Sequence, residues 1–496
     1  MTGRHARWAV ATMLITSATA LTAGALAPPG DAVPTAPTTQ SSASSQAPQS
    51  SQAALPAVGS PVFAYVRALD EAAARGVWPE FTTSAVPLAV FDGERTFLFR
   101  HPSPPPEFSP VPGHPGVFLA SGRYAGVQGN SNRDIGGVRT ATVIVTSAQS
   151  AERAMLAIVE EVFHVFWRTT HSVFRPDELT RYAYPLRDAD NLRRLLAEDE
   201  ALSRALEATE AVDAARWAEA ALRIRRERTA GLADDVRAFE TAIEMLEGPA
   251  NYVARVAVGE PPGRTADRLR APRPAEDIRW RFYDSGAALC LLLDRLSPGW
   301  RERIQRQPTL AIGPLAEEAV RAKGVEAATF PAAETTRLAA RADAGVAELV
   351  GHQQRLRTEL FNRPGWRMTV EVEEGVEPFQ VRRFDPINLM VLDAGEIVHP
   401  NYLSLTVPGG SVEFTNTGFV RDTFGGTVAI TSPAGAHPLR QGVRRLTIVG
   451  LSGEPTVASR SGATTLEAPG VRLTLAGADT RVEGTEIRII VKRHRP

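Results

Sequence analysis

Glu160, Glu161 and His164 lie at the centre of residues 154–167, a segment in which eleven of the fourteen residues are apolar. An α-helix that is apolar on nearly every side belongs in a protein interior. Ionisable side chains in an interior are costly unless they pair with each other or bind a metal ion. Residues four apart in a helix project from the same face, so Glu160 and His164 are placed to share one partner. The segment therefore predicts either a metal site or a buried hydrogen-bonded cluster.

A catalytic metal site needs about three protein ligands and one open position. Two ligands one helical turn apart suit such a site, and a carboxylate beside the first ligand can act as general base. Glu160 and His164 fit the ligand positions, and Glu161 fits that of the base. The best candidate for a third ligand is Glu247, in another apolar segment. Zn²⁺ is the expected ion, although two carboxylates and one imidazole also suit a harder divalent ion such as manganese or calcium.

These residues resemble the motifs of the gluzincin metallopeptidases, in which H-E-x-x-H is followed by a second helix bearing E-G-x-A-x-Y. The second motif is complete over residues 247–252, and residues 283–294 are similar to the Y-x-x-G-x-x-L helix of related secreted bacterial proteins. Two departures stand out: Glu160 replaces the first histidine, and Pro249 falls inside the second motif. The resemblance covers residues 61–361.

The resemblance implies an exported hydrolase that cleaves peptide bonds with metal-activated water. The implied metal ligands are Glu160, His164 and Glu247, and the implied catalytic groups are Glu161, Tyr252 and Tyr283. The tyrosines would donate hydrogen bonds to a tetrahedral oxyanion; their alternative interpretation is that of aromatic core residues. The resemblance also implies that residues 141–146 form an edge strand along which an extended peptide substrate aligns.

Several alternatives remain open at the level of sequence. His171, two turns beyond His164, could replace a ligand. Glu198 and Glu244 could orient a ligand or form salt bridges with the many arginines. A non-catalytic pseudo-peptidase that binds peptide or cell-envelope ligands is the second functional hypothesis, and the Glu160 replacement separates it from the first. A third hypothesis gives the main role to the C-terminal region, as an adhesion module for wall material.

Composition and charge limit the class of partner. The chain has 496 residues, 43% of them hydrophobic, and a net charge of -1 without a basic block, so a nucleic-acid partner is not favoured. Residues 1–27 have a charged start, an apolar run and an Ala-Leu-Ala end, the pattern of a secretory signal peptide. No later segment is apolar enough to span a bilayer. The lone Cys290 rules out an internal disulfide and is expected to be a buried packing residue.

The expected fold class is α+β, with a mostly helical zincin-like domain followed by an all-β, sandwich-like domain. Residues 28–57, rich in Pro, Ser, Thr and Gln, form a linker. The helical domain occupies residues 58–362, and the β domain, with its short alternating runs of Val, Thr and Leu, occupies residues 363–496. The predicted helices are 60–74, 154–167, 191–206 (capped by Asp190), 211–228, 234–258 (kinked or broken near Pro249), 279–296 and 332–361. Two short strands are predicted within residues 85–99 and a third at 141–146.

Overall fold

The computed structural model describes residues 60–493, apart from 385–388, 394–395, 400–401, 408, 416–426, 432–441 and 461. The predicted signal peptide (1–27) and linker (28–57) lie outside the described residues. The chain divides into two compact units, Met1–Thr170 with Val253–Glu260 and His171–Tyr252 with Pro261–Pro496. In the part of the chain that is described, no helix is long and apolar enough to cross a membrane.

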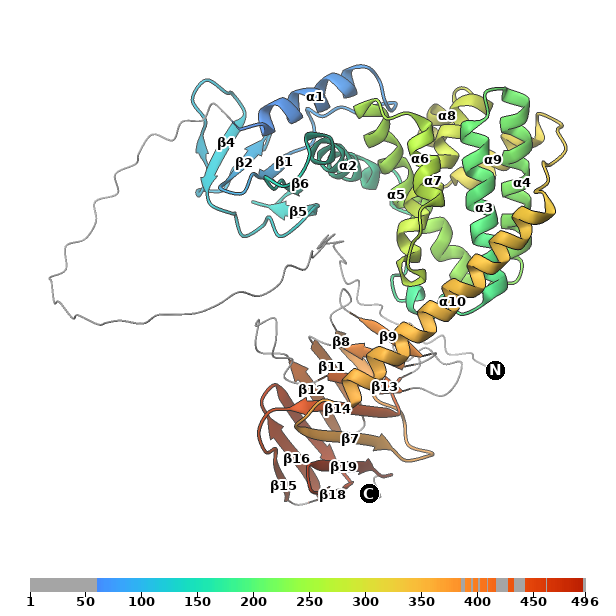
Figure 1. The fold of residues 1–496 in the computed structure, drawn as a ribbon. Helices are drawn as coiled ribbons and strands as arrows, with labels where there is room; N and C mark the ends of the chain where they lie inside the picture. Colours follow the sequence, from blue (N-terminus) through green and yellow to red (C-terminus); the bar gives the residue numbers. More distant parts are fainter. Residues whose placement is uncertain are drawn as a thin grey trace, which may run out of the picture. The chain divides into compact units, whose positions relative to one another are not determined.

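The first unit is a six-stranded sheet with two helices (Figure 1). Its elements are α1 (Val62–Ala74), β1 (Leu88–Phe91), β2 (Arg95–Phe99), β3 (Ser109–Pro110), β4 (Val117–Ser121), β5 (Ser131–Ile135), β6 (Val138–Ile144) and α2 (Ala151–Thr170). The predicted hairpin at β1 and β2 is confirmed. Its turn forms because the Asp92 carboxylate accepts hydrogen bonds from the backbone N–H groups of Glu94 and Arg95.

The strand order β3-β4-β2-β1-β6-β5 corrects one expectation. β6 contains most of the predicted strand at 141–146, but it lies between β1 and β5 and is therefore not an edge strand. β5 occupies the edge, and within the described residues β6 is its one paired neighbour. The edge position was predicted wrongly because an internal strand and an edge strand have the same alternating sequence pattern.

The second unit begins with a group of helices. They are η1 (Thr180–Ala183), α3 (Ala189–Glu207), α4 (Ala211–Thr229), α5 (Asp234–Val258), α6 (Pro262–Arg270), η2 (Ala275–Asp277), α7 (Ile278–Leu296), α8 (Trp300–Arg306), α9 (Ile312–Arg321) and α10 (Ala332–Phe361). The last turns of α5, from Val253, belong to the first unit. The long predicted helices are confirmed to within a few residues.

The predicted N-cap of α3 is wrong, and so is one of the two alternatives predicted for α5. The N-cap of α3 is Asp188, whose Oδ1 accepts hydrogen bonds from the backbone N–H groups of Asp190 and Asn191 at 2.9 and 3.2 Å. Asp190 lies inside the first turn, where a carboxylate is also favourable, so both positions fit the same sequence signal. α5 continues through Pro249, so the predicted break is wrong, and the alternative, a kink there, stays a prediction.

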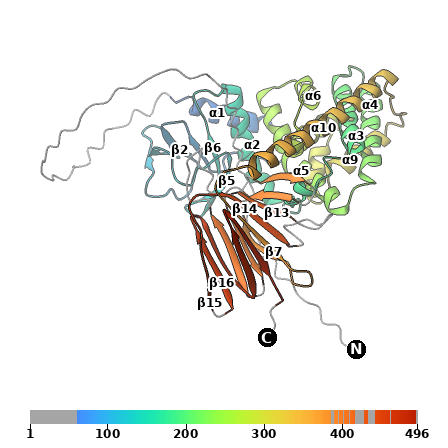
Figure 2. The ribbon, with the colours of Figure 1, turned by 60° about the horizontal axis from the view of Figure 1, so that its bottom comes forward.

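Two further sheets follow α10. Their strands are β7 (Trp366–Val372), β8 (Gln380–Phe384), β9 (Met390–Asp393), β10 (Glu396–His399), β11 (Tyr402–Val407), β12 (Gly410–Thr415), β13 (Thr427–Thr431), β14 (Arg445–Leu451), β15 (Thr456–Arg460), β16 (Ala463–Ala468), β17 (Val471–Ala476), β18 (Ala478–Glu483) and β19 (Glu486–Val491). One sheet has the order β18-β19-β7-β14-β13-β10-β9, and the other has the order β15-β16-β17-β12-β11-β8. Figure 2 shows β7, β13 and β14 of the first sheet and β15 and β16 of the second.

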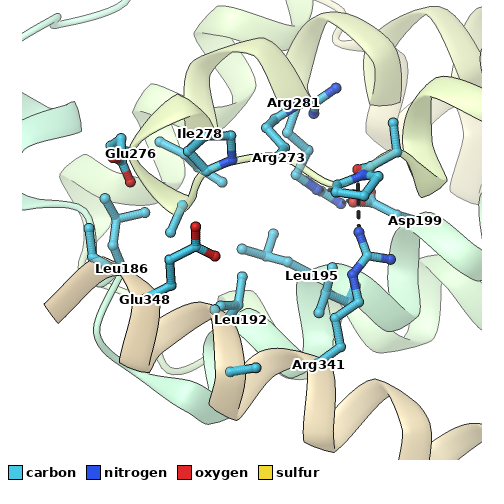
Figure 3. A pocket seen from close by; sticks show the side chains of 18 of the residues that line it. Leu186, Leu192, Leu195, Asp199, Arg273, Glu276, Ile278, Arg281, Arg341 and Glu348 are labelled. Carbon is cyan, nitrogen blue, oxygen red and sulfur yellow. Dashed lines mark hydrogen bonds and ion pairs between the residues drawn. The ribbon is translucent and has the colours of Figure 1, made fainter. Parts of the chain in front are cut away.

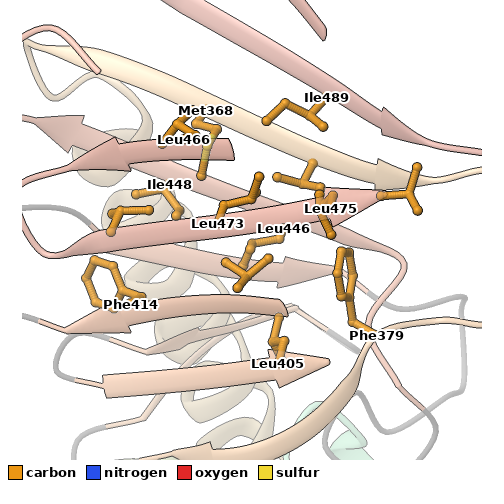
Figure 4. Packing of buried hydrophobic residues seen from close by; sticks show 14 of the residues in the cluster. Met368, Phe379, Leu405, Phe414, Leu446, Ile448, Leu466, Leu473, Leu475 and Ile489 are labelled. Atoms are coloured by element: carbon orange, nitrogen blue, oxygen red, sulfur yellow. The ribbon is translucent and has the colours of Figure 1, made fainter. Parts of the chain in front are cut away.

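The inward side chains of both sheets form one apolar core (Figure 4). Met368, Ile448 and Ile489 come from the first sheet, and Phe414 and Leu473 come from the second. Two sheets that bury alternate residues against each other form a β-sandwich. The predicted combination of helices with an all-β C-terminal region is therefore confirmed.

Candidate metal centre

α2 holds the first two candidate ligands. It is buried along most of its length because its apolar residues surround the axis, and Phe163 packs edge-on against Trp78 and Phe81 at centroid distances of 5.5 and 5.2 Å. His164 Nε2 lies 3.9 Å from Glu160 Oε1, one turn earlier. The His164 side chain is 7% exposed and that of Glu160 is 25% exposed, so the pair opens toward solvent on the glutamate side.

Glu247, on α5, completes a group of three. One ligand atom from each of Glu160, His164 and Glu247 lies within 4.8 Å of the other two, so the three side chains can hold one metal ion. The donors are two carboxylates and an imidazole. This set suits a divalent ion that accepts both oxygen and nitrogen ligands, such as Zn²⁺ or Mn²⁺. Glu161, the neighbour of Glu160, is buried on the same helix.

Arg279, on α7, contacts Glu247 directly. Its Nη2 lies 2.9 Å from Glu247 Oε1 and 3.2 Å from Glu178 Oε1, and Nη1 donates a hydrogen bond to Tyr283 Oη. Burial lowers the pKa of Arg279, but the contacts with Tyr283, Glu247 and Glu178 outweigh burial and raise it above its ordinary value. A guanidinium cation therefore shares the Glu247 carboxylate with any bound metal ion.

The two candidate tyrosines are in different positions. Tyr252 donates a hydrogen bond from Oη to Asp294 Oδ2 at 2.7 Å, and the other oxygen of Asp294 accepts one from Trp300 Nε1 at 2.8 Å. Tyr252 is five residues after Glu247, about 140° around α5, so the two side chains leave different faces of the helix. Burial and the charge of Asp294 raise the pKa of Tyr252. Tyr283, in contrast, is linked to Glu247 through Arg279.

The motif glycines bring α5 and α7 together. A Cβ added to Gly248 would lie 2.7 Å from the Cα of Gly286, and the reverse substitution gives the same distance. Helix axes can approach this closely only where both surfaces lack a side chain. The crossing fixes Glu247, next to Gly248, beside the α7 residues Arg279 and Tyr283. The close packing of α5 against α7 therefore requires glycine at both positions, 248 and 286.

The other candidate residues form separate contacts. Glu198 binds Arg225 and Arg281 at 2.7 and 2.9 Å, and Glu244 binds Arg225 at 2.8 Å. Both glutamates therefore form salt bridges with arginines, one of the two roles that the sequence left open for them. His171 follows the end of α2, and its Nε2 lies 3.3 Å from the carbonyl oxygen of Ile304. Burial lowers the pKa of His171 to about 4, so the ring is neutral at pH 7. Cys290 is buried, as predicted.

The sequence reasoning missed Arg279 and Glu178. Arg279 is 32 residues from Glu247, and its only local signal is its position one turn before Tyr283, which places both on one face of a helix. Nothing in that spacing identifies the carboxylate that the guanidinium contacts.

Comparisons with protein-family models, with curated proteins and with solved structures give no match.

Proposed function

We propose that this chain is an exported, metal-dependent peptide hydrolase with a modified zinc-peptidase site. The observation that carries the proposal is the convergence of Glu160, His164 and Glu247 within 4.8 Å. The apolar core around α2 excludes water from one side of the group and leaves Glu160 partly open to solvent. The signal-like pattern of residues 1–27 supports export.

Each residue has a specific role in this proposal. Glu160, His164 and Glu247 hold the ion, which supplies Lewis acidity that polarises a carbonyl group and lowers the pKa of water. Glu161 accepts the proton of the attacking water and passes it to the leaving amine. The position of β5 at the edge of its sheet supports binding of an extended peptide, because the outward N–H and C=O groups of an edge strand can pair with a substrate backbone. Tyr283 positions Arg279, and Tyr252 has a structural role.

Metal content tests the centre directly. We expect the purified protein to bind close to one equivalent of zinc or manganese, measured by mass spectrometry after dialysis, and the variant H164A/E247A to lose it. The matched control is H352A/E276A, which removes an exposed histidine–glutamate pair 3.9 Å apart. No metal in the unaltered protein, or equal metal in both double variants, would contradict the proposed centre.

The Glu161→Gln variant separates catalysis from metal binding. We expect it to keep the metal and to lose about 10²–10⁴-fold in the rate of peptide cleavage, because the water would lack its general base. Glu152→Gln, in the exposed first turn of the same helix, is the control and should leave the rate unchanged. A peptide-library screen supplies the substrate. Full activity of the Glu161→Gln variant would exclude this residue as the base.

One observation favours the second functional hypothesis, a non-catalytic protein that binds peptide or envelope ligands. The Arg279–Glu247 ion pair occupies one of the three candidate ligands with a cation that the chain itself provides. Two carboxylate ligands also reduce the Lewis acidity of an ion. Under this hypothesis the Glu160→His substitution, which restores the motif histidine, should raise both zinc affinity and peptidase activity above undetectable levels. Under the hydrolase proposal the unaltered chain is already active.

A further inference from the structure

A cavity lies in the helical part of the second unit, and none of the three candidate metal ligands lines it. It has a volume of about 480 Å³ and lies between α3, the connection from α6 to α7, and α10 (Figure 3). This volume is in the range of small-molecule binding sites. Gly345, on α10, helps to form the wall: a Cβ there would lie 3.2 Å from Leu192 Cδ2, so the helices approach closely at this point.

The middle of the cavity is apolar. Leu192, Leu195 and Leu196 line it from α3, Ile278 lines it from the start of α7, and Leu349 lines it from α10. Leu195, Ile278 and Leu349 are at most 6% exposed, whereas Leu192 and Leu196 are half-buried. Apolar surface that remains open to water in this way is covered favourably by an apolar ligand.

One end of the cavity is cationic. Arg281 binds Asp199 at 2.8 Å, and Arg273 binds Asp284 at 2.6 Å, so these two guanidinium groups have carboxylate partners. Arg341, on α10, differs from them. Its Nη2 donates hydrogen bonds to the carbonyl oxygens of Arg270 and Ala271 at 3.1 and 3.3 Å. These acceptors are carbonyl groups at the C-terminal end of α6, and within the described part of the chain no carboxylate lies within ion-pair distance of Arg341.

The opposite end contains two glutamates. Glu348 is seven residues after Arg341 on α10, about 10 Å along the helix axis, and it lines the same cavity. Glu276 also lies at this end, where its carboxylate is 3.9 Å from His352 (Figure 3). Arg355, three residues after His352, also lines this end, so its charges are mixed. Arg355 is exposed, whereas Arg341 is half-buried, so an anionic group inside the cavity is attracted to the Arg341 end, with the leucines beside it.

We propose that this cavity binds a single-chain fatty acid, with its carboxylate on Arg341 and its acyl chain over the leucines. A peptide is the less favourable occupant, because between Arg341 and Glu348 its backbone amides would meet leucine and alanine side chains and Gly345. Unpaired amide groups are costly to bury, whereas an acyl chain has none. The proposal does not depend on metal at Glu160, His164 and Glu247.

Calorimetric titration of the purified protein with dodecanoate tests the charge requirement. We expect dodecanoate to bind and dodecylamine, which has the same chain with a cationic head, to show no binding. Arg341→Met should weaken dodecanoate binding about tenfold or more, because a charged hydrogen bond to the carboxylate is lost. The control is Arg337→Met, one turn earlier on α10, where the arginine pairs with Glu334 outside the cavity. Equal affinities of the two variants would overturn the proposal.

A second pair of variants tests the location. Ala344→Phe places a ring into the cavity from α10, whereas Ala340→Phe places one on the exposed surface of the same helix. We expect the first variant to abolish dodecanoate binding and the second to keep it, with circular dichroism showing that both remain folded. Binding that survives Ala344→Phe would overturn the proposal. Tighter binding of a leucine-rich tripeptide than of dodecanoate would also overturn it.

Discussion

At the residue scale, Arg279 controls the charge of the candidate metal centre. A guanidinium 2.9 Å from Oε1 and a divalent ion would both bind the Glu247 carboxylate, so the two cations compete for it unless Arg279 turns toward Glu178, its other carboxylate. Both side chains of the Arg279–Glu247 pair are at most 10% exposed, and the loss of one partner from such a buried pair is strongly destabilising. The stability of an Arg279 variant, measured with and without metal, therefore tests whether Glu247 binds Arg279 or a metal ion.

The Arg279→Gln variant should be less stable without metal, by about 3–5 kcal/mol, because Glu247 would lose its buried arginine. A divalent ion should restore part of that loss by binding the folded state, and zinc affinity should rise. Urea unfolding with EDTA and with zinc measures both effects. Glu178→Gln is the control, since it keeps the Arg279–Glu247 pair. If zinc stabilises the Arg279→Gln variant no more than the unaltered protein, competition at Glu247 is excluded.

Asp199 gives the protein a defined pH dependence. Burial raises its pKa from 3.8 to about 6, despite the opposing charge of Arg281. The folded state therefore holds the proton more tightly than the unfolded state, and the stabilising contribution of this proton is complete below about pH 4 and lost as pH rises through 6. The upper limit of this contribution is roughly 3 kcal/mol.

The Asp199→Asn variant removes this titration while keeping the shape of the side chain. We expect its stability, relative to the unaltered protein, to rise between about pH 4 and pH 6 and to stay constant above that range. Urea unfolding at intervals of pH measures the difference. Neighbouring groups such as Glu198 are present in both proteins, so their contributions cancel in the difference between the two free energies of unfolding. Parallel stability curves across this range would show that Asp199 does not titrate in it.

The sequence predicted the three candidate ligands but not their electrostatic partners, for a physical reason. Glu160 and His164 are one turn apart, so helical periodicity alone places them together. Glu247 was identified by the motif around it. Arg279 meets Glu247 only because α5 and α7 cross at their glycines, and no local pattern encodes which residues face each other across such a crossing.

At the element scale, the crossing of α5 and α7 places Glu247 beside Arg279 and Tyr283. Gly286→Ala would place its Cβ 2.7 Å from the Cα of Gly248 and force the helices apart. Overpacking costs about 1–3 kcal/mol, partly offset by the better helix propensity of alanine, so we expect a net loss of about 1–2 kcal/mol and weaker metal binding. Gly263→Ala, in α6, is the control because open space surrounds it and no stability should be lost. Unchanged stability and metal content in Gly286→Ala would show that the contact is not needed.

The limits of the long helices could be predicted from the sequence, but the elements that lie next to one another could not. α10 and α5 match their predicted limits because apolar spacing and end signals are local. The short helices α6, α8 and α9 were not predicted, since two or three turns give little periodicity. The position of β5 at the sheet edge depends on strand order, which links segments far apart in the chain.

At the scale of the whole molecule, α10 joins the helices of the second unit to the β-sandwich. Near its end, Leu360 packs in a buried cluster with Leu392 and Val398 from the first sheet. Arg187 adds a polar tie, donating hydrogen bonds to Gln353 Oε1 at 2.9 Å and to the carbonyl oxygen of Leu392 at 3.2 Å. Buried contacts of this kind couple the unfolding of two regions, so helices and sandwich should unfold together.

The Leu360→Ala variant tests this coupling. The cavity it creates should cost about 2–5 kcal/mol, and because the lost contacts are those between α10 and the sandwich, calorimetry should resolve two separate transitions. Leu338→Ala, a buried position near the start of the same helix, is the matched control: it should cost a similar amount while the helices and sandwich still unfold together. A single transition in Leu360→Ala would mean that the Arg187 contacts suffice to couple the two regions. Two transitions in the unaltered protein would mean that the sandwich folds independently of α10.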